Sequence, residues 1–235
     1  MPKPISIRLP QPKLQSSFSL EKALHQRKSY RAYKKTHLSV GEISQLLFAG
    51  QGIIKKRRKR TVPSAGALYP VEIYLVSGKI KGIPPGVYKY QPKLHRLIKI
   101  LNEDKRKELL KATLFQFWIE EAPAVIVLCG VFWKTLSKYG REGNSFVFME
   151  IGHTAQNISL QATSLNLGTV CIGGFKKRRV EKALSLAKDE KPLYLIPVGK
   201  IFKDYQKNEA KVLKKYRRLL QNFFLSENQN YDKCF

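Results

Sequence analysis

Acidic residues are scarce in this 235-residue chain, in which 17 Asp and Glu stand against 44 Lys and Arg, for a formal net charge of +27. The ion-pair networks of thermophilic proteins need both signs, so they do not explain this composition. A positive field of this size suits nucleic acid, an anionic membrane surface or a phosphorylated cofactor as the binding partner. Charge alone does not choose among the three.

Cysteines and long apolar runs are also scarce. Cys129, Cys171 and Cys234 are odd in number and widely spaced, which excludes a disulfide framework and a Cys-x-x-Cys metal site, and we expect them to be buried small hydrophobic residues. The longest apolar stretches, such as 122–133, are far shorter than the ~20 residues that span a bilayer. The first residues lack the features of a secretory signal. We therefore expect a cytoplasmic protein without membrane insertion.

Familiar catalytic and binding motifs are missing as well. The sequence has no His-Glu-x-x-His zinc motif, no Gly-x-Ser-x-Gly, no Gly-x-Gly-x-x-Gly and no Walker loop. It also has no zinc finger and no aromatic RNA-binding motif. Hydrophobic residues nevertheless make up 43% of the chain, which is enough to build a core and excludes global disorder.

Hydrophobic periodicity predicts one domain, 18–200, preceded by an extended arm, 1–17, and followed by a basic helical tail, 201–235. Ser39 and Glu42 fit a capping box, which predicts a helix that begins after Ser39. The remaining predicted elements are helices over 20–26, 109–118 and 146–167, the last stopped by Gly168, and strands over 71–77, 86–90, 97–101, 123–131, 169–172 and 193–198.

Three blocks without acids concentrate the positive charge: Lys55–Arg60, Lys176–Arg179 and the cations between Lys211 and Arg218. A basic run of this length is a motif of low specificity, and a solvated loop is the simpler interpretation. A protein that binds nucleic acid or another polyanion is therefore the second hypothesis.

Three short segments combine side-chain donors or glycines with accessible backbone. Arg27, Ser29 and Arg31 alternate, so in an extended segment they share a face that can bind phosphate, although a solvated basic turn has the same pattern. The glycine pair 173–174 follows a predicted strand, where it either exposes backbone amides to a ligand or forms a tight turn. The third segment is the turn-like stretch Pro63–Gly66.

In their order and spacing, RKSYRAY, PSAGALYPVEIYLV, GVYKY, KYG, MEIGHTAQN, IGGF and PLYLIPVGK resemble the nitroreductase family, specifically its SagB-type dehydrogenases, which form thiazoles and oxazoles. The resemblance covers roughly Phe18 to Lys200. It implies an α+β fold with a central, mostly antiparallel sheet flanked by helices, assembled as an interlocked homodimer. It also implies an FMN-dependent oxidoreductase that passes hydride between flavin N5 and a small-molecule or peptide substrate or NAD(P)H.

The same resemblance implies which residues contact FMN. A cation near the flavin N1–O2 edge favours the anionic reduced form, which is a physical reason for Arg31. The expected contacts are Arg27, Lys28, Ser29 and Arg31 at the phosphate, ribityl chain and pyrimidine edge, Pro63, Ser64, Ala65 and Gly66 in a loop from the other subunit, Gly173 and Gly174 at N5, and Lys200 as a further phosphate-binding base.

Lys138 and Tyr139 match the pair that azoline dehydrogenases of this branch use to abstract a proton while hydride leaves to N5. A plain surface lysine is the alternative for Lys138. Glu150 and His153 are expected to hold the long helix in place and not to be catalytic.

The chain departs from the pattern of this branch after the Lys-Tyr-Gly segment. Glu142 and Ser145 stand where relatives often carry arginines. A flavin-holding protein without turnover is therefore a third hypothesis.

Overall fold

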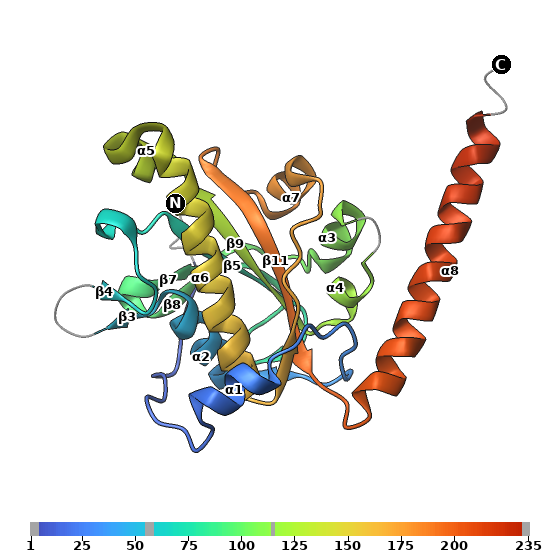
Figure 1. Ribbon diagram of the computed structural model, residues 1–235, viewed down its shortest axis with the longest axis horizontal. Coiled ribbons are helices and arrows are strands. Elements are labelled where there is room, and N and C mark those ends of the chain that lie inside the picture. The colour runs from blue at the N-terminus through green and yellow to red at the C-terminus, as the bar shows by residue number, and fades with distance from the viewer. Residues whose placement is uncertain (1–4, 55–58, 114–115, 232–235) are drawn as a thin grey trace.

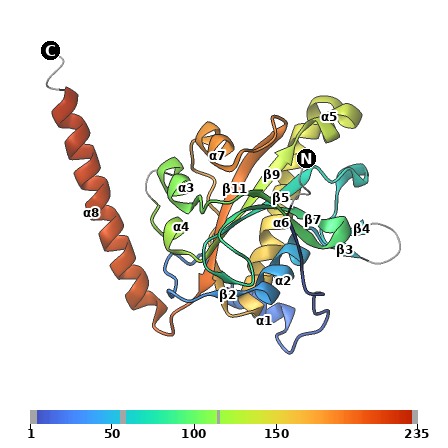
Figure 2. The ribbon, with the colours of Figure 1, turned by 180° about the vertical axis from the view of Figure 1, so that it is seen from behind.

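The computed structural model describes residues 5–54, 59–113 and 116–231 (Figure 1). Most of the predicted Lys55–Arg60 run, and Cys234, lie outside these ranges. A seven-stranded sheet forms the centre of the molecule, and helices cover both of its faces (Figures 1 and 2). The prediction of an α+β fold with a central sheet flanked by helices is confirmed.

All neighbouring strands of the central sheet are antiparallel, in the order β1-β8-β7-β5-β9-β11-β10. These strands are β1 (Ser6–Arg8), β5 (Val71–Ser77), β7 (Gly86–Gln91), β8 (Arg96–Leu101), β9 (Ala124–Val131), β10 (Leu167–Thr169) and β11 (Glu190–Lys200). Two short pairs lie outside the sheet, β2 (Leu38–Ser39) with β6 (Ile80–Lys81) and β3 (Ile53–Ile54) with β4 (Lys59–Arg60).

Strand β9 is apolar along its whole length because both faces of the sheet are covered. Ala124, Ile126 and Leu128 belong to the core on one face, and Val125 and Val127 belong to the core on the other. This alternation follows from the two-residue period of a strand. The strand predicted over 123–131, buried on both faces, is confirmed.

The first core is covered by α2 (Val40–Gln51) and α6 (Gly143–Ser164). The capping box at the start of α2 is confirmed: the Ser39 hydroxyl accepts the N–H of Glu42, and the Glu42 carboxylate accepts the N–H of Ser39. Helix α1 (Leu20–Gln26) begins in a similar way, since the Ser19 hydroxyl accepts a backbone N–H of its first turn.

The end of α6 differs from the prediction. The helix stops at Ser164, and Asn166 takes the left-handed conformation, with φ of 54°, that ends it. Asparagine tolerates this conformation better than most side chains, so no glycine is needed there. The predicted stop, Gly168, lies in β10, where a Cβ would come within 2.7 Å of the Tyr30 side chain.

The second core is covered by α3 (Arg106–Ala112), α4 (Trp118–Glu121) and α7 (Lys177–Leu184). The single helix predicted over 109–118 was wrong, because two short helices occupy this region. Helices α5 (Trp133–Tyr139) and α7 were not predicted, since α7 buries only two of its residues and α5 only one, too few for a clear apolar period.

The last helix, α8 (Tyr205–Tyr231), stands away from the body beyond its first turns (Figures 1 and 2). Its base is held by ring contacts of Tyr205 with Tyr30 at 4.5 Å and of Tyr216 with Trp118 at 5.1 Å. Within the described ranges, no helix combines the length and the apolar composition needed to cross a bilayer.

The two cysteines in the described part of the chain differ in environment. Cys129 is buried in β9, as expected, whereas Cys171 is exposed. The expectation of a buried residue was wrong for Cys171 because β10 ends at Thr169, two residues before it.

Candidate functional site

Seven of the predicted site residues lie together beside the edge strand β10. The segment after α1 runs along this strand: the N–H of Tyr30 donates to the carbonyl of Thr169 at 2.9 Å, and Ser29 forms a β-bridge with the same residue. Lys200 pairs with Leu167 of β10, and its ammonium lies 3.6 Å from the Glu42 carboxylate. We call the following residues the cationic group: Arg27, Lys28, Ser29, Arg31, Gly173, Gly174 and Lys200.

The start of α8 holds one end of the cationic group. The backbone N–H of Arg31 donates to the Tyr205 hydroxyl at 2.7 Å, and its guanidinium lies 3.7 Å from the carboxylate of Glu209. The Lys28 ammonium lies 4.7 Å from the centre of the Tyr205 ring. The tail helix therefore positions a segment that lies more than 170 residues before it in the chain.

The other end of the group lies near Cys171. Although the residue is exposed, partial desolvation raises the pKa of its thiol, and the Ser159 hydroxyl and the Arg27 guanidinium act in the opposite direction. The Arg27 guanidinium therefore acts on Cys171, which lies two residues before Gly173.

The cationic group fits a phosphorylated ligand by the chemistry of its donors. Its side chains are guanidinium, ammonium and hydroxyl groups, which donate to phosphate oxygens. A Cβ at Gly174 would meet nothing within 4 Å, and one at Gly173 would only reach ordinary contact with Tyr194 at 3.5 Å. Open space therefore lies next to backbone amides, which is what a ring that approaches the main chain requires.

A second group brings the turn at 63–66 against the end of α5. A Cβ on Gly66 would lie 2.8 Å from the Tyr139 hydroxyl and 2.9 Å from the Lys138 ammonium, and Gly66 has a φ of +61°. We call Pro63, Ser64, Ala65, Gly66, Lys138 and Tyr139 the loop group. Sequence motifs predicted the members of this group, but not that they touch one another.

Glu150 of α6 holds this turn in place. Its Oε1 accepts hydrogen bonds from the Ser64 hydroxyl at 2.9 Å and from the N–H of Ala65 at 3.0 Å. The side chain is buried, its Oε2 has no partner in the described part of the chain, and burial raises the pKa of the carboxyl. We expected Glu150 to hold the helix, but its hydrogen bonds hold the loop. The sequence signal for this role of Glu150 was an acidic residue placed between the apolar residues Val147 and Ile151.

A chain of polar contacts from Arg60 through α2 to α6 lies next to the loop group. The Arg60 guanidinium donates to the Gln51 side chain at 2.7 Å, and Gln51 donates to Thr154 of α6 at 2.9 Å. The guanidinium also lies 4.5 Å from the centre of the Tyr69 ring, and the N–H of Tyr69 donates to the Ser64 hydroxyl. Burial lowers the pKa of Arg60. His153, which we expected to hold the helix, is exposed.

Helix α5, which carries Lys138 and Tyr139, is tied to the sheet by two side chains. The Lys134 ammonium lies 2.9 Å from the Glu72 carboxylate, and the Trp133 indole N–H donates to Asp189 at 2.8 Å. These contacts set the position of the helix end relative to β5 and β11.

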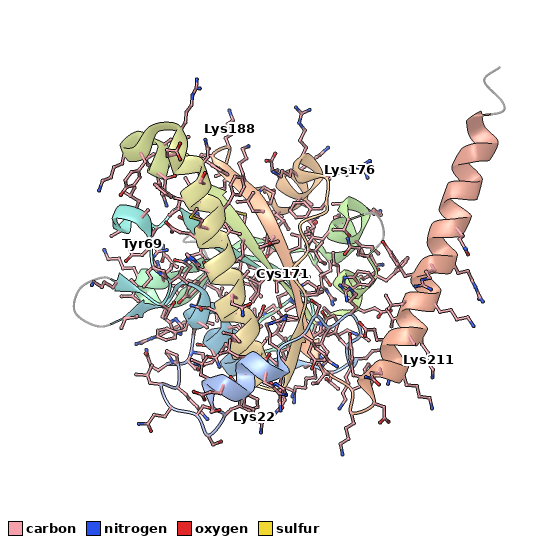
Figure 3. The ribbon with its side chains drawn as sticks, in the orientation of Figure 1. Lys22, Tyr69, Cys171, Lys176, Lys188 and Lys211 are labelled. Carbon is pink, nitrogen blue, oxygen red and sulfur yellow. The ribbon has the colours of Figure 1, made fainter. Side chains whose placement is uncertain are left out.

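Within one chain, the cationic group and the loop group lie apart along α6. Glu150 contacts the loop group, whereas Ser159, nine residues later, lies 4.0 Å from Cys171 beside the cationic group. Nine residues correspond to about 13 Å of helix. Tyr69 and Cys171 are accordingly drawn on either side of α6 (Figure 3). A single chain therefore does not bring the cationic group and the loop group together.

A cavity of 750 Å³ opens between residues 13–20, α2 and α6. Its lining contains none of the predicted site residues. Sequence motifs gave no sign of this cavity, since its wall is made from four separate parts of the chain.

Substituting Gly66 with alanine is expected to lower the free energy of unfolding by about 1–2 kcal/mol, because an L side chain disfavours a left-handed backbone. The new Cβ would also press on Lys138 and Tyr139. Denaturant unfolding measures the effect. Gly41→Ala is the matched control: the site is exposed in the first turn of α2, its Cβ would meet nothing closer than 4.0 Å, and stability should rise slightly. Equal stability of the Gly66→Ala variant and the wild type would contradict the expectation.

Comparison with known proteins agrees with this architecture. The model of the nitroreductase family matches residues 24–200. A protein of Methanocaldococcus jannaschii named as a nitroreductase is 43% identical over 181 residues, which cover 77% of this chain and 90% of that protein. The trifolitoxin operon protein TfxC of Rhizobium leguminosarum bv. trifolii is 24% identical over 192 residues, which cover 75% of this chain and 54% of that protein.

A solved structure from Anabaena variabilis, described as a nitroreductase, is similar with a TM-score of 0.75 and 29% identity. The similarity covers 85% of this chain, which spans only 42% of the Anabaena chain. The family match extends over three quarters of the chain and includes every residue of both groups. The chain therefore belongs to the nitroreductase family of oxidoreductases.

Proposed function

We propose that this protein is an FMN-dependent oxidoreductase of the SagB-type branch, with hydride passing between flavin N5 and a small-molecule or peptide substrate or NAD(P)H. The observation that carries the proposal is the cationic group, in which four cations and a hydroxyl from two distant segments lie along β10 and an open glycine turn follows this strand. Family membership makes a flavin the phosphorylated ligand that this arrangement suits.

Each part of the cationic group has a proposed role. Arg27, Lys28, Ser29 and Lys200 bind the phosphate and ribityl chain, and Arg31 places a positive charge at the pyrimidine edge. The amides of residues 173–174 donate toward N5. When bound, FMN supplies a two-electron acceptor that the side chains of this protein do not contain.

We propose a homodimer in which the loop group of one subunit completes the cationic group of the other. The distance between the two groups along α6 supports this arrangement. Large apolar side chains are exposed on α1 and α6, with Leu20, Leu24, Phe148 and Met149 each more than half exposed. Apolar side chains gathered on two helices favour contact with another subunit.

We propose that Lys138, assisted by Tyr139, removes a carbon-bound proton from the substrate as hydride leaves. The Lys138 side chain is exposed beside Gly66, with its ammonium 5.4 Å from the centre of the Tyr139 ring, so an incoming substrate can reach it.

The first test is the visible spectrum of the purified protein after incubation with FMN and desalting. We expect a retained flavin spectrum, and an about 10- to 100-fold weaker affinity for FMN in the Arg27→Ala variant, because a hydrogen bond to a charged group is lost. Riboflavin, which lacks the phosphate, should bind the wild type and this variant equally. Lys22→Ala, at an exposed lysine of α1, is the matched control and should keep the wild-type affinity.

A protein that retains no flavin under any condition would refute the proposal. Retained flavin that neither NADH nor a thiazoline-containing peptide reduces would favour a flavin-holding protein without turnover. Glu142 and Ser145, which stand where relatives often carry arginines, are exposed just after α5. These two residues are the reason to test for a flavin-holding protein without turnover.

A further inference from the structure

The exposed sides of α3, α7 and α8 concentrate positive charge on residues that belong to neither group of the proposed flavin site, although α7 and α8 begin next to the cationic group. Helices α3 and α7 pack together, with the N–H of Lys176 donating to the carbonyl of Ala112 at 2.9 Å. Helix α8 leaves the body on the same side, as the two opposite views show (Figures 1 and 2). Lys176 and Lys211 are drawn on this side in Figure 3.

Helix α8 has a basic stripe opposite the side that packs on the body. Tyr205, Val212 and Tyr216 belong to the second core or pack against it. The four basic residues of the stripe are spaced four, three and four positions apart along the helix. This spacing places them on one face, about 180° from the packed face. The stripe consists of Lys207, Lys211, Lys214 and Arg218, all exposed.

Helix α7 adds a second set of exposed cations. Its first residues, with Lys176 before them, continue the chain directly from the glycine turn of β10. Val180 and Leu184 face the core, which leaves the basic residues on the outer side. This set consists of Lys176, Lys177, Arg178, Arg179 and Lys182.

The acids on these helices do not neutralise the two sets. Glu108 lies 3.9 Å from Lys105, Glu181 lies 3.2 Å from Lys191, and Glu209 lies 3.7 Å from Arg31. Each of these three acids, whose side chains the structure describes, is therefore next to a cation that belongs to neither set. Within residues 5–54, 59–113 and 116–231, no cation of either set is in an ion pair. The charges are thus free to meet an external polyanion.

The surroundings of these cations favour one class of polyanion. Among the described side chains, no large apolar residue is exposed on α3, α7 or α8. A helix that binds membranes needs a free apolar face, and the described apolar side chains of α8 pack on the body. Single-stranded nucleic acid needs exposed aromatic rings on which bases stack. Neither feature is found among the described side chains of these helices, and the cations that they expose suit contact with the phosphates of a duplex.

We propose that α7 and α8 form a surface that binds double-stranded DNA through its phosphates, without reading base sequence. The 27-residue helix α8 is about 40 Å long and stands free of the body along most of this length. The major groove of B-form DNA admits an α-helix, whereas the narrow major groove of A-form RNA does not. The proposal is independent of whether the protein binds a flavin.

The test measures binding of a fluorescently labelled DNA duplex over a series of KCl concentrations. The stripe variant replaces Lys207, Lys211, Lys214 and Arg218 with glutamine. The matched control replaces four exposed lysines of other elements, Lys35, Lys79, Lys81 and Lys93, and so has the same net charge. Far-UV circular dichroism confirms that both variants are folded.

We expect the slope of log K against log salt to fall by about 2 to 4 in the stripe variant, since each lost phosphate contact removes about 0.9. The control should keep the wild-type slope to within about one contact. Equal losses in both variants would refute the surface, because net charge alone would then explain binding. Stronger binding to vesicles of anionic lipid, or to single-stranded DNA of the same length, than to the duplex would also overturn it.

Discussion

Replacing Lys138 with alanine is expected to slow reduction of the bound flavin by a thiazoline-containing peptide about 10²- to 10⁴-fold. Conversion of a thiazoline to a thiazole removes one proton from carbon as hydride leaves for the flavin, so the reaction needs a positioned base. Lys138 lies exposed beside Gly66. Tyr139 is the only other member of the loop group with an ionisable side chain. Stopped-flow bleaching of the flavin absorbance measures the rate.

Reduction by NADH is the internal control for this prediction. Hydride transfer from NADH removes no proton from carbon, so Lys138→Ala should leave that rate near the wild-type value. Lys138→Arg keeps the positive charge but does not accept a proton, and it should be as slow as Lys138→Ala with the peptide. If arginine restored the rate, Lys138 would act through its charge. If both donors slowed equally, the substitution would have disturbed the flavin site as a whole.

Mixing two impaired variants, at an FMN concentration too low to saturate Arg27→Ala, tests the shared site in the same assay. Arg27→Ala damages the cationic group and Lys138→Ala damages the loop group, and we propose that one site takes these groups from different subunits. A heterodimer of the two variants would then contain one intact site. Recovery of activity after subunit exchange supports the arrangement, and no recovery in a confirmed heterodimer contradicts it.

Replacing Glu150 with alanine is expected to lower the free energy of unfolding by about 3 kcal/mol. The substitution leaves the Ser64 hydroxyl and the N–H of Ala65 without their acceptor, which is buried in α6. The turn at 63–66 loses its anchor, so the peptide-dependent rate should also fall. Denaturant unfolding and the flavin assay measure the two effects.

Glu150→Gln separates the hydrogen bonds from the charge. The glutamine oxygen still accepts from Ser64 and Ala65, so this variant should keep most of the stability lost in Glu150→Ala. Because burial raises the pKa of Glu150, the folded chain binds this proton more tightly than the unfolded chain. Wild-type stability should therefore fall as pH rises from the ordinary range of a glutamate carboxyl to the raised pKa. The glutamine variant should lack this fall, and an unchanged pH profile would contradict the assignment.

Features with a local physical cause could be predicted from the sequence. The capping box of Ser39 and Glu42 depends on residues three apart, and it formed as expected. Strand β5 matches its predicted bounds because apolar residues alternate there, and β9 was recognised because an apolar run between turn signals suits a strand covered on both faces. The ordered motifs also indicated the family. The roles of individual site residues stay predictions.

Other features depend on contacts between distant parts of the chain, and only the tertiary structure decided them. Helix α5 is held by the contacts of Lys134 and Trp133 with β5 and with the residue before β11, not by its own apolar pattern. The carboxylate of Glu150 turned toward a loop 85 residues earlier, although its sequence context suggested only a helix position.

By itself, the sequence determined the starts of α1 and α2, strands β5 and β9 and the excess of positive charge, because capping, periodicity and composition carry these properties. The ordered motifs indicated the family and its antiparallel sheet through their resemblance to known proteins. The tertiary structure decided that α6 separates the cationic group from the loop group, and that the cations of α7 and α8 lie on one side of the molecule. These properties depend on how helices pack on the two faces of the sheet. Packing joins residues far apart in the chain, which no local pattern records.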